Sequence, residues 1–351
     1  MQEHKFVVTT DVGKIPRNRQ VIMIDGTVPG WVRGPGDHHW DHHKPGGEAI
    51  QIDEIPLNQI TCGEIRIRHD AVFVTTQLDA DAVVAAASIV LAAQGHRDSF
   101  TVNLQKLRAI AWDCDHLALP PESHWDSLRE FAAKAVAALK QEGFENLKNK
   151  DLLGDQTNWP QEKKNRYQHT LNANFCDSVL WVVEACNGNY SWPGEQGEAD
   201  AYFRKMEEQR PAVGACCHVS NNIAVFDQSG FSEYVDPRLL AQWVIQICPT
   251  ALATITIRDG KAKANQPKPW ADRVWAYTVG RTPGTSPLFS TQGLWEHLTA
   301  LENQSRESHG IPPMTSGWGG REDVGGSSWN DAVITDPHTL VAQIRGFLRK
   351  T

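Results

Sequence analysis

Short apolar runs alternate with helix-like segments in the N-terminal part of the chain. Val21–Ile24 and Ala71–Thr75 are unbroken apolar or β-branched runs, which is typical of strands that are buried on both faces. An alanine-rich segment that indicates a helix follows the second run, and Leu107–Trp112 is interpreted as a third strand. Ser123 is a candidate N-cap for a further helix through about Glu142. This alternation predicts an α/β fold built on a parallel sheet.

A polar middle part separates this pattern from a second one. Residues 143–210 are polar apart from one apolar helix, Phe175–Ala185, and we interpret them as a helical connector. From residue 211 onward strand-like runs (222–226, 251–257 and 273–279) alternate with amphipathic helices (237–247, 291–302 and 338–348). We therefore expect a parallel-sheet domain over 1–142, the connector over 143–210, and a smaller α/β domain over 211–351. The active site is expected in the cleft between the two domains.

Composition narrows the class of protein. The chain has 351 residues, 40% of them hydrophobic and 22% charged, and a formal net charge of -8, which is typical of a soluble globular protein. The acidic balance and the lack of a Lys/Arg cluster argue against a grip on long duplex nucleic acid. No signal peptide pattern is visible, and the longest apolar run, Ala82–Ala93, is shorter than the roughly 20 residues that span a bilayer. For the same reason we expect no membrane partner. The seven cysteines include no CxxC pair, so we expect reduced thiols and a cytoplasmic location.

Metal-ligating side chains gather in one short run and at the expected strand ends. Four histidines and two aspartates fall within Asp37–His43, and both residue types are common ligands of divalent metals. Asp25 follows the first strand, Asp79 and Asp81 follow the second, and Asp113 follows the third. Acids at the carboxyl ends of parallel strands should converge, and a divalent cation would relieve their repulsion. The alternative for Asp79 and Asp81 is stabilisation of a helix N-terminus.

The same residues carry a resemblance to a known family. Asp41-His42-His43 after Asp25, with Leu78–Ala82 (LDADA), resembles the DHH phosphoesterase superfamily, which includes RecJ-type exonucleases, small-oligonucleotide phosphodiesterases and family II inorganic pyrophosphatases. The segment Gly319–Gly326 (GGREDVGG) is similar to the glycine motif of the C-terminal domain that often accompanies them. The DHH motif precedes the DxD motif here, which reverses the family's usual order. The sheet is then circularly permuted, or the LDADA match is fortuitous.

The resemblance implies a role for each matching residue. The metal ligands would be Asp25, His42, Asp79, Asp81 and Asp113, around what is expected to be a pair of Mn²⁺ ions, or Mg²⁺ or Co²⁺. The catalytic residues would be Asp41, His42 and His43, and substrate phosphate would contact Lys44, Gly319, Gly320, Arg321, Gly325 and Gly326. The implied reaction is hydrolysis of a phosphodiester or phosphoanhydride by metal-activated water. The expected substrate is a small nucleotide or a short single-stranded oligonucleotide, and a homodimer is compatible with the sequence.

Three points stay open at the level of sequence. Thr75 stands where the family often has a histidine, so Asp37–His39 is either a spare loop or, like His116, the source of a replacement ligand. Arg321 has the alternative of a surface ion pair with a neighbouring acid. A DHH-like protein that has lost its chemistry and binds metal or nucleotide for regulation is an alternative function. A mononuclear hydrolase that uses only Asp25 and the histidine-rich run is another.

Overall fold

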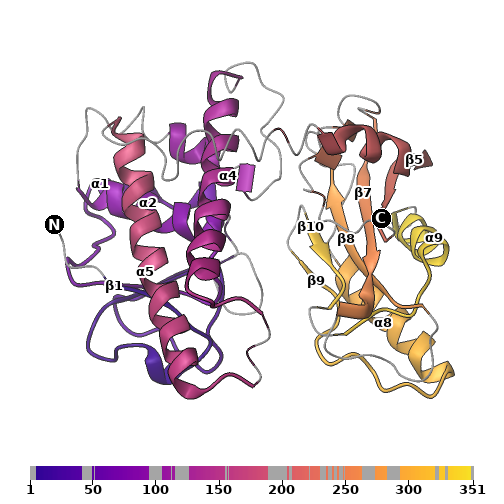
Figure 1. Cartoon of the computed structure of the whole chain (residues 1–351), viewed down its shortest axis with the longest axis horizontal. Coiled ribbons are helices and arrows are strands. Elements are labelled where there is room, and N and C mark those ends of the chain that lie inside the picture. The colour runs from indigo at the N-terminus through magenta and orange to yellow at the C-terminus, as the bar shows by residue number, and fades with distance from the viewer. Residues whose placement is uncertain are drawn as a thin grey trace. The chain divides into compact units, whose positions relative to one another are not determined.

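The computed structural model divides into two compact units (Figure 1). The first unit comprises Met1–Asp115 and Glu122–Arg204, and the second comprises His116–Pro121 and Lys205–Thr351. The structure describes the chain except residues 1–4, 42–49, 51, 95–104, 112, 115–125, 155, 157, 189–203, 205–207, 221, 230–234, 236–238, 241–242, 245–247, 249, 263–272, 283–292, 321–323, 329–330 and 349–351.

A four-stranded parallel sheet forms the centre of the first unit. Its strands are β1 (Lys5–Val8), β2 (Val21–Ile24), β3 (His38–Trp40) and β4 (Val72–Thr75), in the spatial order β1-β4-β2-β3. Every residue of β2 and β4 is buried, as their unbroken apolar runs predict. The expected α/β fold with a parallel sheet is therefore confirmed.

Helices pack around this sheet and around one another. They are α1 (Leu57–Thr61), α2 (Ala80–Gln94), α4 (Asp126–Asn149) and α5 (Gln161–Cys186), with single 3-10 turns at Val12–Lys14 and Ile52–Glu54. Small alanine side chains make up much of α2, which is buried along most of its length and contacts α1 and α5. Figure 1 shows α2 and α5 side by side. The segment expected as a connector thus supplies α5 to the first unit, and α4 runs past residue 142.

Strand β1 is not predicted by the sequence pattern, because only Val8 of its four residues is buried. It is an edge strand, and α5 covers its end. The Val8 amide donates to Asn172 Oδ1 at 2.9 Å, and Gln168 Nε2 donates to the Val8 carbonyl. The Phe6 ring also stacks on Phe73, with ring centroids 5.3 Å apart. Side chains from α5 therefore occupy backbone groups that an exposed edge would offer to another chain.

The strand expected over Leu107–Trp112 is wrong. Residues 105–111 and 113–114 are helical. Lysine, leucine, arginine and alanine dominate this segment and favour a helix, and it has a single β-branched residue. Asp113 is consequently a buried helical residue, and the strand-end argument for it does not hold.

The second unit is built on a six-stranded mixed sheet. Its strands are β5 (Cys217–Ser220), β6 (Ile223–Asp227), β7 (Ala253–Asp259), β8 (Trp275–Arg281), β9 (Gly319–Gly320) and β10 (Val324–Gly326), in the order β5-β6-β7-β8-β10-β9. A 3-10 turn, Gly260–Ala262, follows β7. The helices α8 (Leu294–Ser308) and α9 (Pro337–Leu348) place Leu298 and Ile344 in one core with Tyr277 and Trp318. The α/β pattern expected for this part of the chain is confirmed.

A buried ion pair joins α8 to the segment that leads into α9. Arg306 Nε donates to Glu302 Oε1 at 3.1 Å, and both side chains are at most 5% exposed. Glu302 also accepts from the amides of Ile334 and Thr335 at 2.9 and 3.2 Å and from the Thr335 hydroxyl at 2.6 Å. Arg306 donates to the carbonyls of Pro312 and Ala332. Each charge is therefore surrounded by partners, as burial requires.

Two general features concern the whole described chain. All seven cysteines are free thiols. Within the described ranges, no helix has both the length and the apolar character needed to cross a bilayer.

Candidate metal centre

Two acidic residues emerge side by side from neighbouring strands. The register of β2 and β3 pairs Ile24 with Trp40, and the Asp25 amide donates to the Trp40 carbonyl at 3.1 Å. Asp25 and Asp41 each follow one member of this pair, so both lie at the carboxyl edge of the sheet. They are buried, with exposed fractions of 4% and 2%. This edge is where ligands bind in open parallel sheets.

The backbone at Asp25 is held in an unusual conformation. Its φ angle is 47°, in the left-handed region that non-glycine residues rarely adopt. Gly26 follows with a φ of 139°, and a Cβ atom there would lie 2.2 Å from Thr76 Oγ1. Thr75 Oγ1 lies 3.2 Å from the Asp25 carbonyl oxygen and 2.9 Å from that of Gln77. The Thr75 hydroxyl therefore connects the loops after β2 and β4, at the position where the sequence resemblance leads us to expect a histidine.

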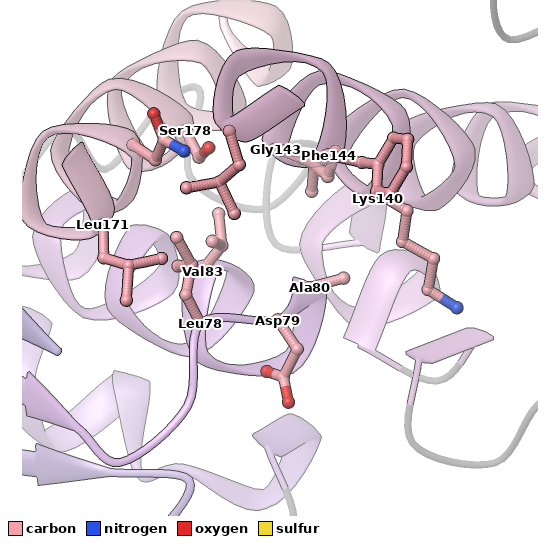
Figure 2. Close-up of a pocket in the computed structure, with 12 residues that line it drawn as sticks. Leu78, Asp79, Ala80, Val83, Lys140, Gly143, Phe144, Leu171 and Ser178 are labelled. Atoms are coloured by element: carbon pink, nitrogen blue, oxygen red, sulfur yellow. The ribbon is translucent and has the colours of Figure 1, made fainter. Parts of the chain in front are cut away.

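Asp79 and Asp81 lie at the start of α2. Asp79 Oδ1 accepts from the Ala82 amide at 3.1 Å, the hydrogen bond of an N-cap. Asp81 lies in the first turn, where the helix dipole stabilises a negative charge. The carboxylate of Asp79 points away from Val83 and Leu171 (Figure 2). The helix-end explanation of these acids is therefore realised, and it also fixes the direction of the Asp79 side chain.

Three of the predicted metal ligands converge. Carboxylate oxygens of Asp25, Asp79 and Asp81 all lie within 4.8 Å of one another, and they form the one group of this kind found in the described part of the chain. Two oxygens bound to one Mg²⁺-sized ion lie at most about 4.2 Å apart, because each bond is about 2.1 Å long. Two ions in a dinuclear site lie about 3.5–4 Å apart. The three carboxylates could therefore hold one metal ion if their oxygens moved slightly closer together. They could equally supply part of the ligands of two neighbouring metal ions.

The other predicted site residues fall into two groups. Asp113 is described but does not belong to the three-carboxylate cluster. His42, His43, Lys44 and Arg321 lie outside the described residues, as does His116, whereas the four glycines predicted to contact phosphate are described.

The spare-loop alternative for Asp37–His39 holds for Asp37 alone, because His38 and His39 lie in β3. The Asp37 carboxylate accepts from the Val21 amide at 2.7 Å and from the Gly34 amide at 2.9 Å, so it fixes the turn before the strand. The His38 ring stacks on Trp40, with centroids 4.9 Å apart. His39 is buried and is not a member of the carboxylate cluster.

His39 instead lies in a hydrogen-bonded group around Asp41. Thr27 Oγ1 donates to Asp41 Oδ2 at 2.7 Å and lies 3.0 Å from His39 Nε2. His39 Nε2 is 3.7 Å from Asp41 Oδ2, and the Trp31 ring meets the His39 ring edge-on at 5.3 Å. The sequence reasoning missed Thr27. The two-residue spacing of His39 and Asp41, which places both side chains on one face of a strand, is the signal that would have joined them.

The glycine-rich segment forms the hairpin β9–β10. Gly325 pairs with Gly320 and Gly326 with Gly319. A Cβ atom on Gly320 would lie 2.2 Å from the Gly325 Cα, and one on Gly326 would lie 2.6 Å from the Tyr277 carbonyl oxygen. Close packing within the unit thus accounts for Gly320, Gly325 and Gly326 without a phosphate ligand, whereas a Cβ atom on Gly319 would meet nothing within 4 Å.

We expect Gly325→Ala to destabilise the second unit by about 1–3 kcal/mol, because the new methyl group overpacks the hairpin. Its Cβ would lie 2.4 Å from Trp295 Cζ2 and 2.6 Å from the Gly319 carbonyl oxygen. Gly319→Ala is the matched control, since nothing lies within 4 Å of a Cβ there. Urea denaturation of both variants measures the difference, and equal free energies of unfolding would contradict the packing argument.

Comparison with known proteins adds two distant likenesses. No family model and no curated protein matches the chain. Among solved structures, it is similar to the pGpG-specific phosphodiesterase PggH from Vibrio cholerae, with a TM-score of 0.39 and 9% identity over 95% of this chain and 98% of that chain. It is also similar to RecJ in complex with Mg²⁺ from Thermus thermophilus, with a TM-score of 0.34 and 10% identity over 95% of this chain and 50% of that chain. TM-scores this low carry no argument about activity, so the candidate site rests on the arrangement of its own carboxylates.

Proposed function

We propose that this protein is a divalent-metal-dependent phosphoesterase of the DHH kind. The observation that carries the proposal is the convergence of Asp25, Asp79 and Asp81 from two strand ends to within 4.8 Å of one another. Three carboxylates in one place repel unless a cation lies between them, and oxygen ligands suit Mn²⁺ and Mg²⁺. A pair of ions is proposed, with Mn²⁺ as the first choice and Mg²⁺ or Co²⁺ as substitutes.

The residues of the site divide the work of hydrolysis. Asp25, Asp79 and Asp81 would hold the metal, which when bound supplies Lewis-acid activation of water and of the phosphoryl group. Asp41, beside Asp25, would orient the site while Thr27 and His39 hold its carboxylate in place. Asp113, His42, His43, Lys44 and Arg321, with the hairpin glycines, stay predictions as further ligands and phosphate contacts.

The substrate we propose is a small nucleotide or a short single-stranded oligonucleotide. The net charge of -8 supports a small substrate over long duplex nucleic acid, which is held mainly through its phosphates. The free thiols of all seven cysteines support a reducing compartment, and we infer the cytoplasm.

The direct test is hydrolysis of bis(p-nitrophenyl) phosphate and of short oligonucleotides by the purified full chain with Mn²⁺, Mg²⁺ or Co²⁺. We expect activity that disappears on chelation and returns with Mn²⁺. An active protein that contains no metal and ignores chelators would overturn the proposal.

One observation favours a second candidate, a regulatory protein that binds metal or nucleotide without turnover. Thr75, at the position of the family's frequent histidine, is fully buried and contacts the carbonyls of two loops, so it is a structural residue. The same assays discriminate the two candidates. Nucleotide binding with no turnover in any of the three metals supports the regulatory protein.

Thr27 gives a test of the support around Asp41. We expect Thr27→Val to lower kcat about 10–100-fold, the usual cost of losing a partner of a site residue, because valine cannot donate to Asp41 Oδ2. Thr27→Ser keeps the hydroxyl and should restore most of the rate. Steady-state kinetics with saturating Mn²⁺ provides the measurement. A serine variant as slow as the valine variant would show that the methyl group matters and the hydrogen bond does not.

A further inference from the structure

A cavity lies on the helical side of the first unit, next to the start of α2. It has a volume of about 220 Å³ and is lined by residues of α2, α4 and α5 and by Leu78 and Asp79. Its walls are mainly apolar, with Val83 from α2 and Leu171 from α5 (Figure 2). Phe144 of α4 also lines it and is 50% exposed, so part of this residue stays open to solvent. We call this space the α4–α5 cavity.

A buried amide in the wall of the α4–α5 cavity has an unused donor. Asn174 is 4% exposed, and its Oδ1 accepts a hydrogen bond from Asn146 Nδ2. Its Nδ2 is buried, and no acceptor for it is found among the described residues. A buried donor without a partner is costly, because it has given up its hydrogen bonds to water and gained none in exchange. A ligand acceptor that reached this amide after a small side-chain adjustment would remove that cost.

The cavity shares one residue with the carboxylate cluster. Asp79 lines the cavity, while its carboxylate points away from the apolar walls and belongs to the cluster with Asp25 and Asp81. A molecule that occupied both places would pass the start of α2 with an apolar part on one side and a metal-seeking part on the other. Lys140, an exposed cation that also lines the cavity, complements a phosphate attached to such a molecule.

We propose that the α4–α5 cavity is a nucleobase subsite, which binds the base of a nucleotide whose phosphate lies at the carboxylate cluster. This inference rests on the proposed function. A nucleobase has apolar faces, which suit Val83, Leu171 and the Phe144 ring, and an edge with acceptors, which suits the Asn174 amide. Pockets for drug-sized ligands hold roughly 300–1,000 Å³, so a space of about 220 Å³ suits a single planar ring system.

Binding of nucleoside monophosphates tests the subsite without any turnover. AMP and GMP are compared with ribose 5-phosphate, which has the phosphate and sugar but no base, by calorimetry on the full chain with Mn²⁺. We expect the nucleotides to bind at least about tenfold more tightly than ribose 5-phosphate. Leu171→Trp fills the cavity and Phe144→Ala removes its aromatic wall. Leu180→Trp, on the same helix at a 39% exposed position that does not line the cavity, is the matched control for Leu171→Trp.

The readout in every variant is the dissociation constant of ribose 5-phosphate divided by that of the nucleotide. We expect it to fall to about one in Leu171→Trp, to fall at least about threefold in Phe144→Ala, and to stay at the wild-type value in Leu180→Trp. Should Leu171→Trp fail to fold, Phe144→Ala decides, because its side chain is half exposed. Equal binding of nucleotides and ribose 5-phosphate by the wild type, or an unchanged ratio in both cavity variants, would overturn the subsite. Hydrolysis of bis(p-nitrophenyl) phosphate, which has no base, is measured separately on the wild type. A failure of the proposed phosphoesterase activity can then be distinguished from a failure of the nucleobase subsite.

Discussion

Replacement of Asp79 by asparagine should abolish metal-dependent phosphoester hydrolysis and leave the fold intact. The neutral amide removes one charge from the cluster with Asp25 and Asp81, so the metal is held poorly or lost. Metal stabilisation of a transition state is worth several kcal/mol, which corresponds to a rate loss of about 10³-fold or more. Initial rates on bis(p-nitrophenyl) phosphate across a Mn²⁺ titration measure the effect.

The same substitution separates the metal role of Asp79 from its role at the helix end. Asparagine is about as good an N-cap as aspartate, so it keeps the hydrogen bond from the Ala82 amide. Without metal, Asp79→Asn should be at least as stable as the wild type because one like charge is removed, whereas Asp79→Ala should lose about 1 kcal/mol. Mn²⁺ should raise the melting temperature of the wild type alone. Full activity in both variants would exclude Asp79 from the metal centre.

Glu302→Ala should cause the largest loss of stability of any single change considered for the second unit. The substitution leaves the Arg306 guanidinium, 4% exposed, buried without its carboxylate, and it removes the acceptor for the amides of Ile334 and Thr335. Removing one partner of a buried ion pair typically costs about 3–5 kcal/mol. Urea denaturation followed by circular dichroism gives the free energy of unfolding.

Glu307→Ala is the matched control for this change, because Glu307 lies on the same helix and is exposed. Surface substitutions of this kind usually change stability by less than about 0.5 kcal/mol. A loss in Glu302→Ala no larger than that of the control would mean that Arg306 finds other partners, and the buried ion pair would then contribute little.

The strands of the first unit show which parts of this fold the sequence can predict. β2 and β4 are buried on both faces, which requires apolar or β-branched residues at every position, and such an unbroken run can be recognised from the local sequence. β1 and β3 are edge strands of polar or mixed composition, and they are specified by pairing with β4 and β2. The short apolar run at Leu107–Trp112 predicts a strand, whereas residues 105–111 are helical; a run this short has no clear period, so helix propensity is the better guide there.

The candidate site was predictable to the extent that it follows from strand ends. Asp25 and Asp79 were expected to converge because each follows a buried strand, and the structure brings them together with Asp81. The prediction that Asp113 joins this site depended on a strand over Leu107–Trp112, where residues 107–111 are helical. Thr27 was missed because its contact with Asp41 crosses a long loop, and no local pattern marks a threonine that meets an acid 14 positions later.

The covering of β1 by α5 has a consequence for how the chain folds while it is being synthesised. The hydrogen bond from the Val8 amide to Asn172 joins residues 164 positions apart, so the sheet's first edge is finished by one of the last segments of its own unit. When synthesis has reached only α4, the edge of β1 has emerged but α5, which covers it, has not. Such long-range closure slows folding and exposes the intermediate to association with other chains. Nascent chains that stop before α5 should therefore be the ones that recruit chaperones.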